Sequence, residues 1–189
     1  RYGFSSPILS LMRFGFLDGK YSVFDYGCGR GDDLRGLIEN NIDAHGWDPH
    51  FKKDHPKIES DIVNLGFVLN VIEDFKERVE AMQGAYSLAR GLLVISVILE
   101  NNNSSLGKTF RDGIITKKET FQKYFTPNEI KDFVEENLQE EVVAVAPGVY
   151  FVFKDKIIEQ DFLLNRVRSS SSYYRERLNL PPRLTRKER

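Results

Sequence analysis

Cysteine is almost absent from this sequence, because Cys28 is the only one among 189 residues. A single cysteine forms neither a disulfide within the chain nor a zinc site built from several thiolates, which favours a cytoplasmic protein. No apolar run reaches the roughly 18 residues that span a bilayer. The apolar stretch 8–17 is short and is interrupted by Arg13, so we expect no membrane contact.

Histidine is scarce as well, with His45, His50 and His55 as its only members. They stand around an expected strand end and loop, without the neighbouring carboxylates typical of a metal site, so we predict no metal. No signal peptide is visible. The chain begins with Arg1 rather than Met, which leaves open whether it is a fragment of a longer protein. The oligomeric state is likewise open.

The net charge of -1 is unevenly distributed along the chain. Residues 164–189 contain eight Lys and Arg against two Glu, whereas residues 1–163 contain 19 basic and 26 acidic residues. A basic tail after an acidic body can indicate contact with nucleic acid. A solvated helix end with a frayed tail explains the same pattern equally well.

Short apolar strands alternate with amphipathic helices over most of the chain. We expect strands at 22–26, 43–48, from 61 onward and at 91–99, and a hairpin over 141–155 that turns at Pro147-Gly148. Helices are expected over 6–16, 32–41, 73–90 and 125–138. In the third helix the apolar face should comprise Phe75, Val79, Met82, Tyr86 and Leu88. In the last helix, Thr126 and Glu129 form a capping box with Pro127 at the first helical position, and the polar segment 100–113 is expected to be a loop.

This alternation predicts an α/β fold of the Rossmann-like, doubly wound type, with a mostly parallel sheet and a C-terminal antiparallel hairpin. Only twelve residues separate Asp48 from Asp61, too few for a regular crossover helix and a further strand. The third-strand region should therefore be shortened. We divide the chain into an N-terminal helical lead-in (1–19), a main domain (20–163) and a basic extension (164–189).

The segment VFDYGCGRGDD, residues 23–33, places a glycine turn directly after the first expected strand. Its glycines are spaced G-x-G-x-G, with Asp32 where the dinucleotide fingerprint has its third glycine. Asp32 and Asp33 suit the dipole of the following helix but would repel a pyrophosphate. No Gly-Lys-Ser/Thr follows, which excludes a P-loop. The turn therefore favours a cationic or zwitterionic cofactor.

S-adenosylmethionine has this character, because it carries a sulfonium, an ammonium and one carboxylate, and no phosphate. Asp25 can accept hydrogen bonds from the ammonium, and Asp48 can bind both ribose hydroxyls. The cofactor-binding residues that we predict are Asp25, Tyr26, Gly27, Gly29, Gly31, Asp48, Pro49 and Gly66. Trp47 is interpreted as a core residue and Cys28 as a small space-filler within the turn.

The ordered set VFDYGCGRGDD, GWDP and DIVNLGFVLNVIED resembles the class I S-adenosylmethionine-dependent methyltransferases. With DGIITKKETFQKYFT and APGVYFVF added, residues 20–155 resemble the DNA phosphorothioation-associated methyltransferases of bacteria. This resemblance implies methyl transfer in the context of DNA modification, and it does not identify an acceptor.

The residue types limit the chemistry of such an enzyme. Base C5-methylation needs a cysteine nucleophile, and Cys28 is committed to the glycine turn. The Asn/Asp-Pro-Pro-aromatic motif of amino-methyltransferases has no counterpart in NLGFVLN, residues 64–70. Direct in-line transfer remains, with Asn64, Phe67 and Asn70 as candidate catalytic residues beside Gly66.

For the acceptor, nucleic acid is the first expectation. In residues 108–125 Lys and Arg are interleaved with aromatic residues, a pattern that can bind phosphates and stack bases, so the loop 104–125 and the basic tail are the expected contacts to nucleic acid. Packing of these aromatic residues under the sheet, with solvated lysines, is the simpler alternative. Two other functions stay open: a cofactor-binding accessory module on DNA that transfers no methyl group, and a small-molecule methyltransferase.

Overall fold

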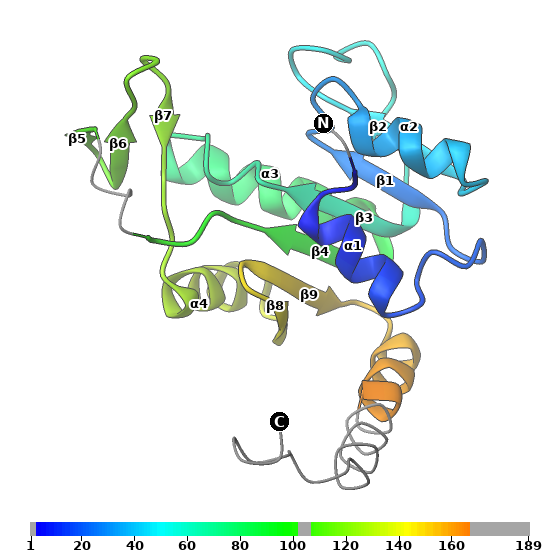
Figure 1. Ribbon diagram of the computed structural model, residues 1–189. Helices are drawn as coiled ribbons and strands as arrows, with labels where there is room; N and C mark the ends of the chain where they lie inside the picture. The colour runs from blue at the N-terminus through cyan, green and yellow to red at the C-terminus, as the bar shows by residue number, and fades with distance from the viewer. Residues whose placement is uncertain (1–2, 102–106, 167–189) are drawn as a thin grey trace, which may run out of the picture. The chain divides into compact units, whose positions relative to one another are not determined.

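Short apolar segments form one sheet in the computed structural model of the protein, which describes residues 3–101 and 107–166 (Figure 1). The six strands lie in the order β2-β1-β3-β4-β9-β8. Strands β1 to β4 are parallel, whereas β9 runs antiparallel to both β4 and β8. The predicted α/β fold is thus confirmed. Its strands are β1 (Val23–Tyr26), β2 (Ala44–Trp47), β3 (Ser60–Gly66), β4 (Ala89–Ser96), β8 (Val142–Ala146) and β9 (Val149–Phe153).

Helices cover both faces of this sheet. On one face, α3 (Phe75–Leu88) and α4 (Pro127–Leu138) pack over a cluster that includes Phe24, Val63 and Leu93, all fully buried. On the other, α1 (Ser6–Arg13) contacts β3, β4 and β9, and Figure 1 shows it in front of the sheet with α3 behind. The helix α2 (Asp32–Glu39) packs against β2.

The sheet ends at β2, as the short spacing after Asp48 predicts. Asp48 and Lys52 form an isolated bridge, and the chain reaches β3 through turns instead of a further helix and strand. The prediction of a shortened third-strand region is confirmed. Because the crossover is missing, the loop after β2 stays close to the glycine turn.

The first helix differs from its prediction at both ends. Its N-cap is Ser5 rather than Ser6, and it ends at Arg13 instead of continuing to residue 16. Gly15 adopts a φ of +77°, its N–H donates to the carbonyl of Met12, and that of Phe16 donates to the carbonyl of Leu11. The first available glycine therefore terminates this helix, ahead of Gly19.

The prediction of a loop over residues 100–113 is wrong from residue 108 onward, where the segment 108–122 begins. This segment forms an antiparallel sheet of β5 (Lys108–Phe110), β6 (Gly113–Ile115) and β7 (Phe121–Gln122), set apart from the main sheet (Figure 1). Strands of two or three residues leave almost no alternating pattern in a sequence. Gly113 permits the close approach, because a Cβ there would lie 2.7 Å from the carbonyl oxygen of Gln122.

Most of the apolar face that we predict for α3 faces the core, since Met82 is buried and Val79, Tyr86 and Leu88 pack against the core while partly buried. Arg78, Met82 and Ala85 are buried, whereas Phe75 is 54% exposed. The guanidinium of Arg78 is retained inside by the carboxylate of Asp112. An ion pair thus occupies a position where helical periodicity alone favours an apolar side chain.

The local chemistry of α4 and of the hairpin agrees with the sequence. Thr126 Oγ1 accepts the N–H of Glu129 at 3.1 Å, and the Glu129 carboxylate accepts the N–H of Thr126 at 3.3 Å. This capping box starts the helix where it is predicted. Strands β8 and β9 flank the Pro147-Gly148 turn, in which Gly148 has a φ of +69°.

The chain divides into two compact units, Arg1–Asp155 and Lys156–Arg189. In the second unit, residues 156–166 form a helix, and most of the basic extension lies outside the described residues. Within 3–101 and 107–166, no helix is long and apolar enough to cross a membrane. In the same ranges, no group of three or more His, Cys, Asp or Glu side chains could hold a metal ion.

Candidate functional site

The glycine turn after β1 has a backbone that only glycine adopts without strain. Gly27, Gly29 and Gly31 have φ angles of +81°, +55° and +80°. A side chain in this left-handed region costs roughly 1–2 kcal/mol. A Cβ on Gly27 would in addition collide with Val68 Cγ2, whereas a Cβ on Gly29 would meet nothing within 4 Å. The turn is therefore packed on one side and open at Gly29.

Polar residues stand at the ends of three neighbouring strands on one face of the sheet. Asp25 lies opposite Asn64, and Ser96 lies opposite Gly66, so their side chains share this face. Asn64 Nδ2 donates to Asp25 Oδ1 at 2.8 Å. Among the described residues, Asn64 Oδ1 and Ser96 Oγ are buried without a hydrogen-bond partner. Buried polar atoms are normally paired, so these two mark a place where a polar ligand or water is needed.

Asp48 connects the end of β2 to the glycine turn. Its Oδ2 accepts the N–H of Gly29 at 2.9 Å, and its Oδ1 accepts the N–H groups of His50 and Phe51 at 2.8 and 2.9 Å. Burial opposes ionisation of this carboxyl, but the three N–H donors outweigh it and lower the pKa of Asp48 below its usual value. A stable carboxylate therefore lies directly beside the open side of the turn.

Two of the predicted cofactor-binding residues, Tyr26 and Pro49, are less suited to contact a cofactor than the sequence suggests. The Tyr26 ring points into the core, where its hydroxyl accepts a hydrogen bond from Lys57 Nζ at 3.0 Å. Only the backbone of Tyr26 can border a cofactor. Pro49 is exposed beyond the end of β2. Trp47 packs on Tyr26 with ring centroids 5.1 Å apart, consistent with its interpretation as a core residue.

Gly66 and Phe67 form the exit from β3. A Cβ on Gly66 would lie 3.0 Å from Asn64 Nδ2, so glycine leaves room for the amide that holds Asp25. Phe67 adopts a φ of +60°, an unusual value for an aromatic residue, and its N–H donates to the carbonyl of Ser96 at 2.9 Å. Strained backbone of this kind collects at functional sites.

The structure argues against our prediction of Asn70 as a catalytic residue. Its side chain is fully buried. Its Nδ2 donates to the carbonyls of Ile98 and Lys123, and its Oδ1 accepts the N–H of Ile98. The amide thus ties the loop after β3 to the segments before and after the small sheet, and it presents no surface to an acceptor.

Cys28 lies within the turn in an environment that disfavours a thiolate. Burial, followed by the negative charges of Asp25 and Asp48, raises the pKa of the Cys28 thiol to about 11. This shift supports the interpretation of Cys28 as a space-filler. It also weakens any mechanism that requires a cysteine nucleophile.

We accordingly expect iodoacetamide to alkylate native Cys28 about 100-fold more slowly at pH 8 than it alkylates a free cysteine, because the thiolate fraction is lower by that factor. Mass spectrometry of the intact protein measures this rate. The same reaction in denaturant is the control, and it should proceed at the ordinary rate. Rapid alkylation of the native protein would contradict the raised pKa.

The basic groups expected in residues 104–125 are only partly available to a partner. Lys123 is 4% exposed, and its Nζ forms ion pairs with Asp112 at 3.3 Å and Glu129 at 2.6 Å. Arg111 pairs with Asp74 at 3.3 Å. The simpler alternative of solvated lysines is also wrong for Lys123. Lys108, Lys117 and Lys118 remain exposed and belong to the described part of this segment.

Sequence reasoning missed two features of the site region. Phe51 is 58% exposed, and its ring lies next to the glycine turn, because the guanidinium of Arg30 stands 5.5 Å from the ring centroid. The second feature is an ion-pair cluster in which the buried cations Arg78 and Lys123 pair with the partly exposed carboxylates of Asp112 and Glu129. A usable signal was that position 78 lies one helical turn before Met82, on the same buried stripe of α3.

Comparison of the sequence with known protein families finds no match, and no curated protein matches it. The fold, by contrast, is shared with Rossmann-like, class I methyltransferases of known structure.

Magnesium protoporphyrin IX methyltransferase from Synechocystis PCC 6803, with bound SAH, has a TM-score of 0.55 and 15% identity, covering 79% of this chain and 81% of that chain. A 1,6-didemethyltoxoflavin-N1-methyltransferase from Burkholderia thailandensis has a TM-score of 0.55 and 16% identity, covering 76% of this chain and 74% of that chain. CalS10, an amino pentose methyltransferase from Micromonospora echinaspora, has a TM-score of 0.55 and 12% identity, covering 81% of this chain and 93% of that chain. At these identities the likeness shows the fold alone.

Proposed function

We propose that the protein is an S-adenosylmethionine-dependent methyltransferase. The observation that supports this most is the left-handed glycine turn, open at Gly29, between carboxylates at the ends of β1 and β2. A pyrophosphate on this turn would face Asp32 and Asp33 at the start of α2. Fold neighbours crystallised with S-adenosylhomocysteine or its precursor add support for a phosphate-free cofactor.

The residues at the turn fit such a cofactor group by group. Asp25, oriented by Asn64, is the proposed acceptor for an ammonium, and the unpaired Asn64 Oδ1 adds a second acceptor nearby. Asp48 is proposed to bind a ribose hydroxyl through Oδ2, which accepts only the N–H of Gly29, whereas Oδ1 already accepts two N–H groups. The exposed ring of Phe51 offers an apolar surface for an adenine.

Bound S-adenosylmethionine supplies a methyl group on a positively charged sulfur, so the protein mainly has to align a nucleophile. Gly66 and Phe67 are proposed to border the transfer site, because they leave β3 beside Asn64. The N–H of Phe67 is fixed by Ser96, which holds this exit in one conformation. Asn70 is removed from the proposed catalytic set and assigned a positioning role.

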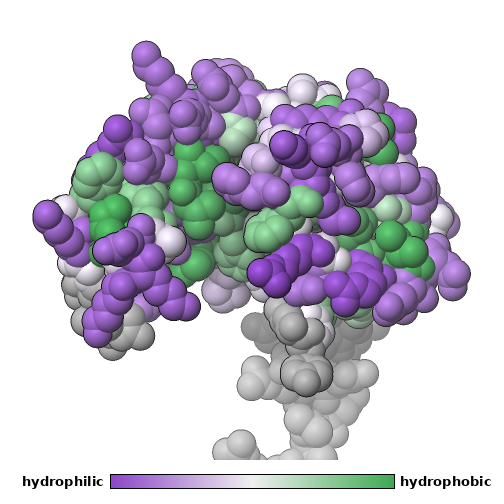
Figure 2. All heavy atoms as spheres, turned by 90° about the horizontal axis from the view of Figure 1, so that it is seen from above, coloured by the Kyte–Doolittle hydropathy of each residue, from purple (hydrophilic) through white to green (hydrophobic). Residues whose placement is uncertain are grey.

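For the acceptor, we propose a small molecule as the first candidate. Val71 and Ile98 are exposed apolar residues in segments that follow β3 and β4. The face seen from above in Figure 2 is mainly hydrophilic, with hydrophobic residues gathered around the small sheet at the left and in a second group at the right. Nucleic acid in a phosphorothioation context is the second candidate, supported by the resemblance and by the basic residues of 164–189.

The proposed cofactor site predicts the effect of one substitution. Asp48→Ala should weaken S-adenosylmethionine binding about 10- to 100-fold, because it removes charge-assisted hydrogen bonds and the tether of the turn. Isothermal titration calorimetry measures the loss. Asp43→Ala is the matched control, since Asp43 is an exposed carboxylate just before β2. Equal affinities of the two variants would contradict the proposed role of Asp48.

The acceptor is tested with radiolabelled methyl groups on the cofactor. Label transferred to a metabolite fraction supports the small-molecule candidate, and label on DNA or RNA supports the nucleic-acid candidate. DNA binding that weakens steeply with salt would favour the second candidate. Cofactor binding without transfer to any fraction would instead indicate an accessory module.

A further inference from the structure

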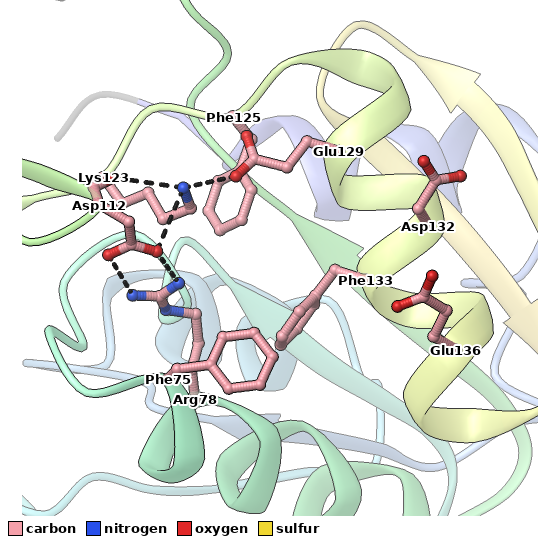
Figure 3. A pocket seen from close by; sticks show the side chains of 9 residues that line it. All are labelled: Phe75, Arg78, Asp112, Lys123, Phe125, Glu129, Asp132, Phe133 and Glu136. Atoms are coloured by element: carbon pink, nitrogen blue, oxygen red, sulfur yellow. Dashed lines mark hydrogen bonds and ion pairs between the residues drawn. The ribbon is translucent and has the colours of Figure 1, made fainter.

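A cavity of about 450 Å³ lies between α3, α4 and the segment that returns from the small sheet (Figure 3). None of the residues that line it belongs to the glycine turn or to the loops after β1 and β2. Its size is within the range of small-molecule sites in proteins. The cavity is therefore distinct from the proposed cofactor site.

Aromatic rings form the apolar wall of this cavity. Phe75 and Phe133 meet edge to face, with ring centroids 5.6 Å apart and an interplanar angle of 84°. Phe75 is 54% exposed although it begins α3 next to a buried partner, so its surface faces the opening. Phe125 is buried deeper in the wall. A ligand with an apolar body would cover this aromatic surface.

The opposite wall of the cavity contains two buried cations, Arg78 and Lys123. Arg78 is 1% exposed, and its Nη1 and Nη2 donate to the two oxygens of Asp112 at 2.7 and 3.1 Å. Lys123 pairs with Asp112 and Glu129. Both cations are thus neutralised by carboxylates of the protein itself. An anionic ligand would find no uncompensated positive charge in this wall.

Negative charge remains on α4. Asp132 and Glu136 line the cavity one helical turn apart, and Figure 3 shows them on the side opposite the ion pairs. Neither carboxylate has an ion-pair or hydrogen-bond partner among the described residues. Like charges four residues apart on a helix repel each other, and a bound cation would relieve this repulsion. The lining as a whole carries four acidic and two basic side chains.

We propose that this cavity binds an organic cation, an ammonium attached to an aromatic or other apolar body. Asp132 and Glu136 hold the ammonium, while the rings of Phe75 and Phe133 cover the body and add a cation–π attraction. The site is separate from the proposed cofactor site, because it shares no lining residue with the glycine turn. It requires only charge complementarity and an apolar wall.

The probe for this site is 2-phenylethylamine, with phenylacetate and 2-phenylethanol as anionic and neutral analogues of similar size. Titration of the full chain, followed by protein NMR, should show saturable binding of the amine in the millimolar range and at least fivefold weaker binding of both analogues. Added salt should weaken binding of the amine and leave binding of 2-phenylethanol unchanged.

Three variants locate the binding. Asp132→Asn combined with Glu136→Gln should weaken the amine about tenfold, and Phe75→Ala about threefold. Glu135→Gln is the matched control, since it removes one charge from the same helix outside the cavity and should change affinity less than twofold. All four substituted positions are at least partly exposed, so these variants should fold.

Two results would overturn the proposal. Equal affinity for the amine and phenylacetate would show that charge plays no part. Binding that is lost in Asp48→Ala and retained in the Asp132→Asn, Glu136→Gln variant would place the amine at the glycine turn. Because neither result depends on methyl transfer, failure of this site leaves the proposed enzymatic function untouched.

Discussion

Gly29→Ala should weaken S-adenosylmethionine binding about 100-fold while lowering the free energy of unfolding by only about 1 kcal/mol. The small loss of stability follows from the φ of +55° at Gly29, which strains any L side chain. The large loss of affinity follows from position, because a Cβ on Gly29 points into the open side of the turn. The added methyl group would occupy space that the cofactor needs.

Gly19→Ala is the matched control for this experiment. Gly19 has a φ of +89°, and a Cβ there likewise meets nothing within 4 Å, but the residue lies outside the glycine turn. This variant should lose similar stability and keep its affinity. Calorimetric titration and thermal unfolding of both variants separate backbone strain from lost contact. Unchanged affinity in Gly29→Ala would show that the cofactor does not approach this face of the turn.

Local chemistry explains which elements were predictable. The capping box around Thr126, the Pro147-Gly148 hairpin and the glycine turn each depend on a few adjacent residues whose backbone preferences are strong. The shortened third-strand region followed from chain length alone, since too few residues separate Asp48 from Asp61. Such features appear in a sequence because they require no knowledge of distant partners.

The features that sequence reasoning missed depend on distant partners. The Asn70 amide donates to the carbonyl of Lys123, 53 residues away, so this candidate catalytic group has a structural role instead. Arg78 donates to Asp112, 34 residues away, so a charged side chain is buried on α3 at a position where periodicity favours an apolar one. The short strands of the small sheet are stabilised by each other. Nothing in the local pattern specifies these pairings, because the fold itself brings the partners together.

Asp112→Asn should lower the free energy of unfolding at pH 7 by about 2 kcal/mol, the largest effect that we expect from one surface-accessible carboxylate. The substitution leaves the buried guanidinium of Arg78 and the ammonium of Lys123 short of one negative charge. The figure is below that for a fully buried pair, because Arg78 keeps its hydrogen bonds to the carbonyl of Ile72. Urea unfolding of both proteins measures the difference.

The pH dependence of this stability difference tests whether the charge of Asp112 causes the loss. Burial opposes ionisation of Asp112, but hydrogen bonds and charge from Arg78, with Lys123, lower the pKa of its carboxyl in the folded protein. A lowered folded pKa contributes stability that is present above the unfolded value of about 4 and is lost as pH falls through the folded value. The stability gap between wild type and Asp112→Asn should therefore be constant from neutral pH down to about 5 and shrink below about pH 4.

Asp132→Asn provides the control for this pH dependence, since Asp132 is exposed on α4 and has no ion-pair partner among the described residues. Its stability should match that of the wild type within about 0.5 kcal/mol at every pH. A gap for Asp112→Asn that persists unchanged into acid would mean that shape, not charge, accounts for the loss. If the gap closes, the ionised Asp112 is what holds the small sheet against α3, and with it the wall of the cavity between α3 and α4.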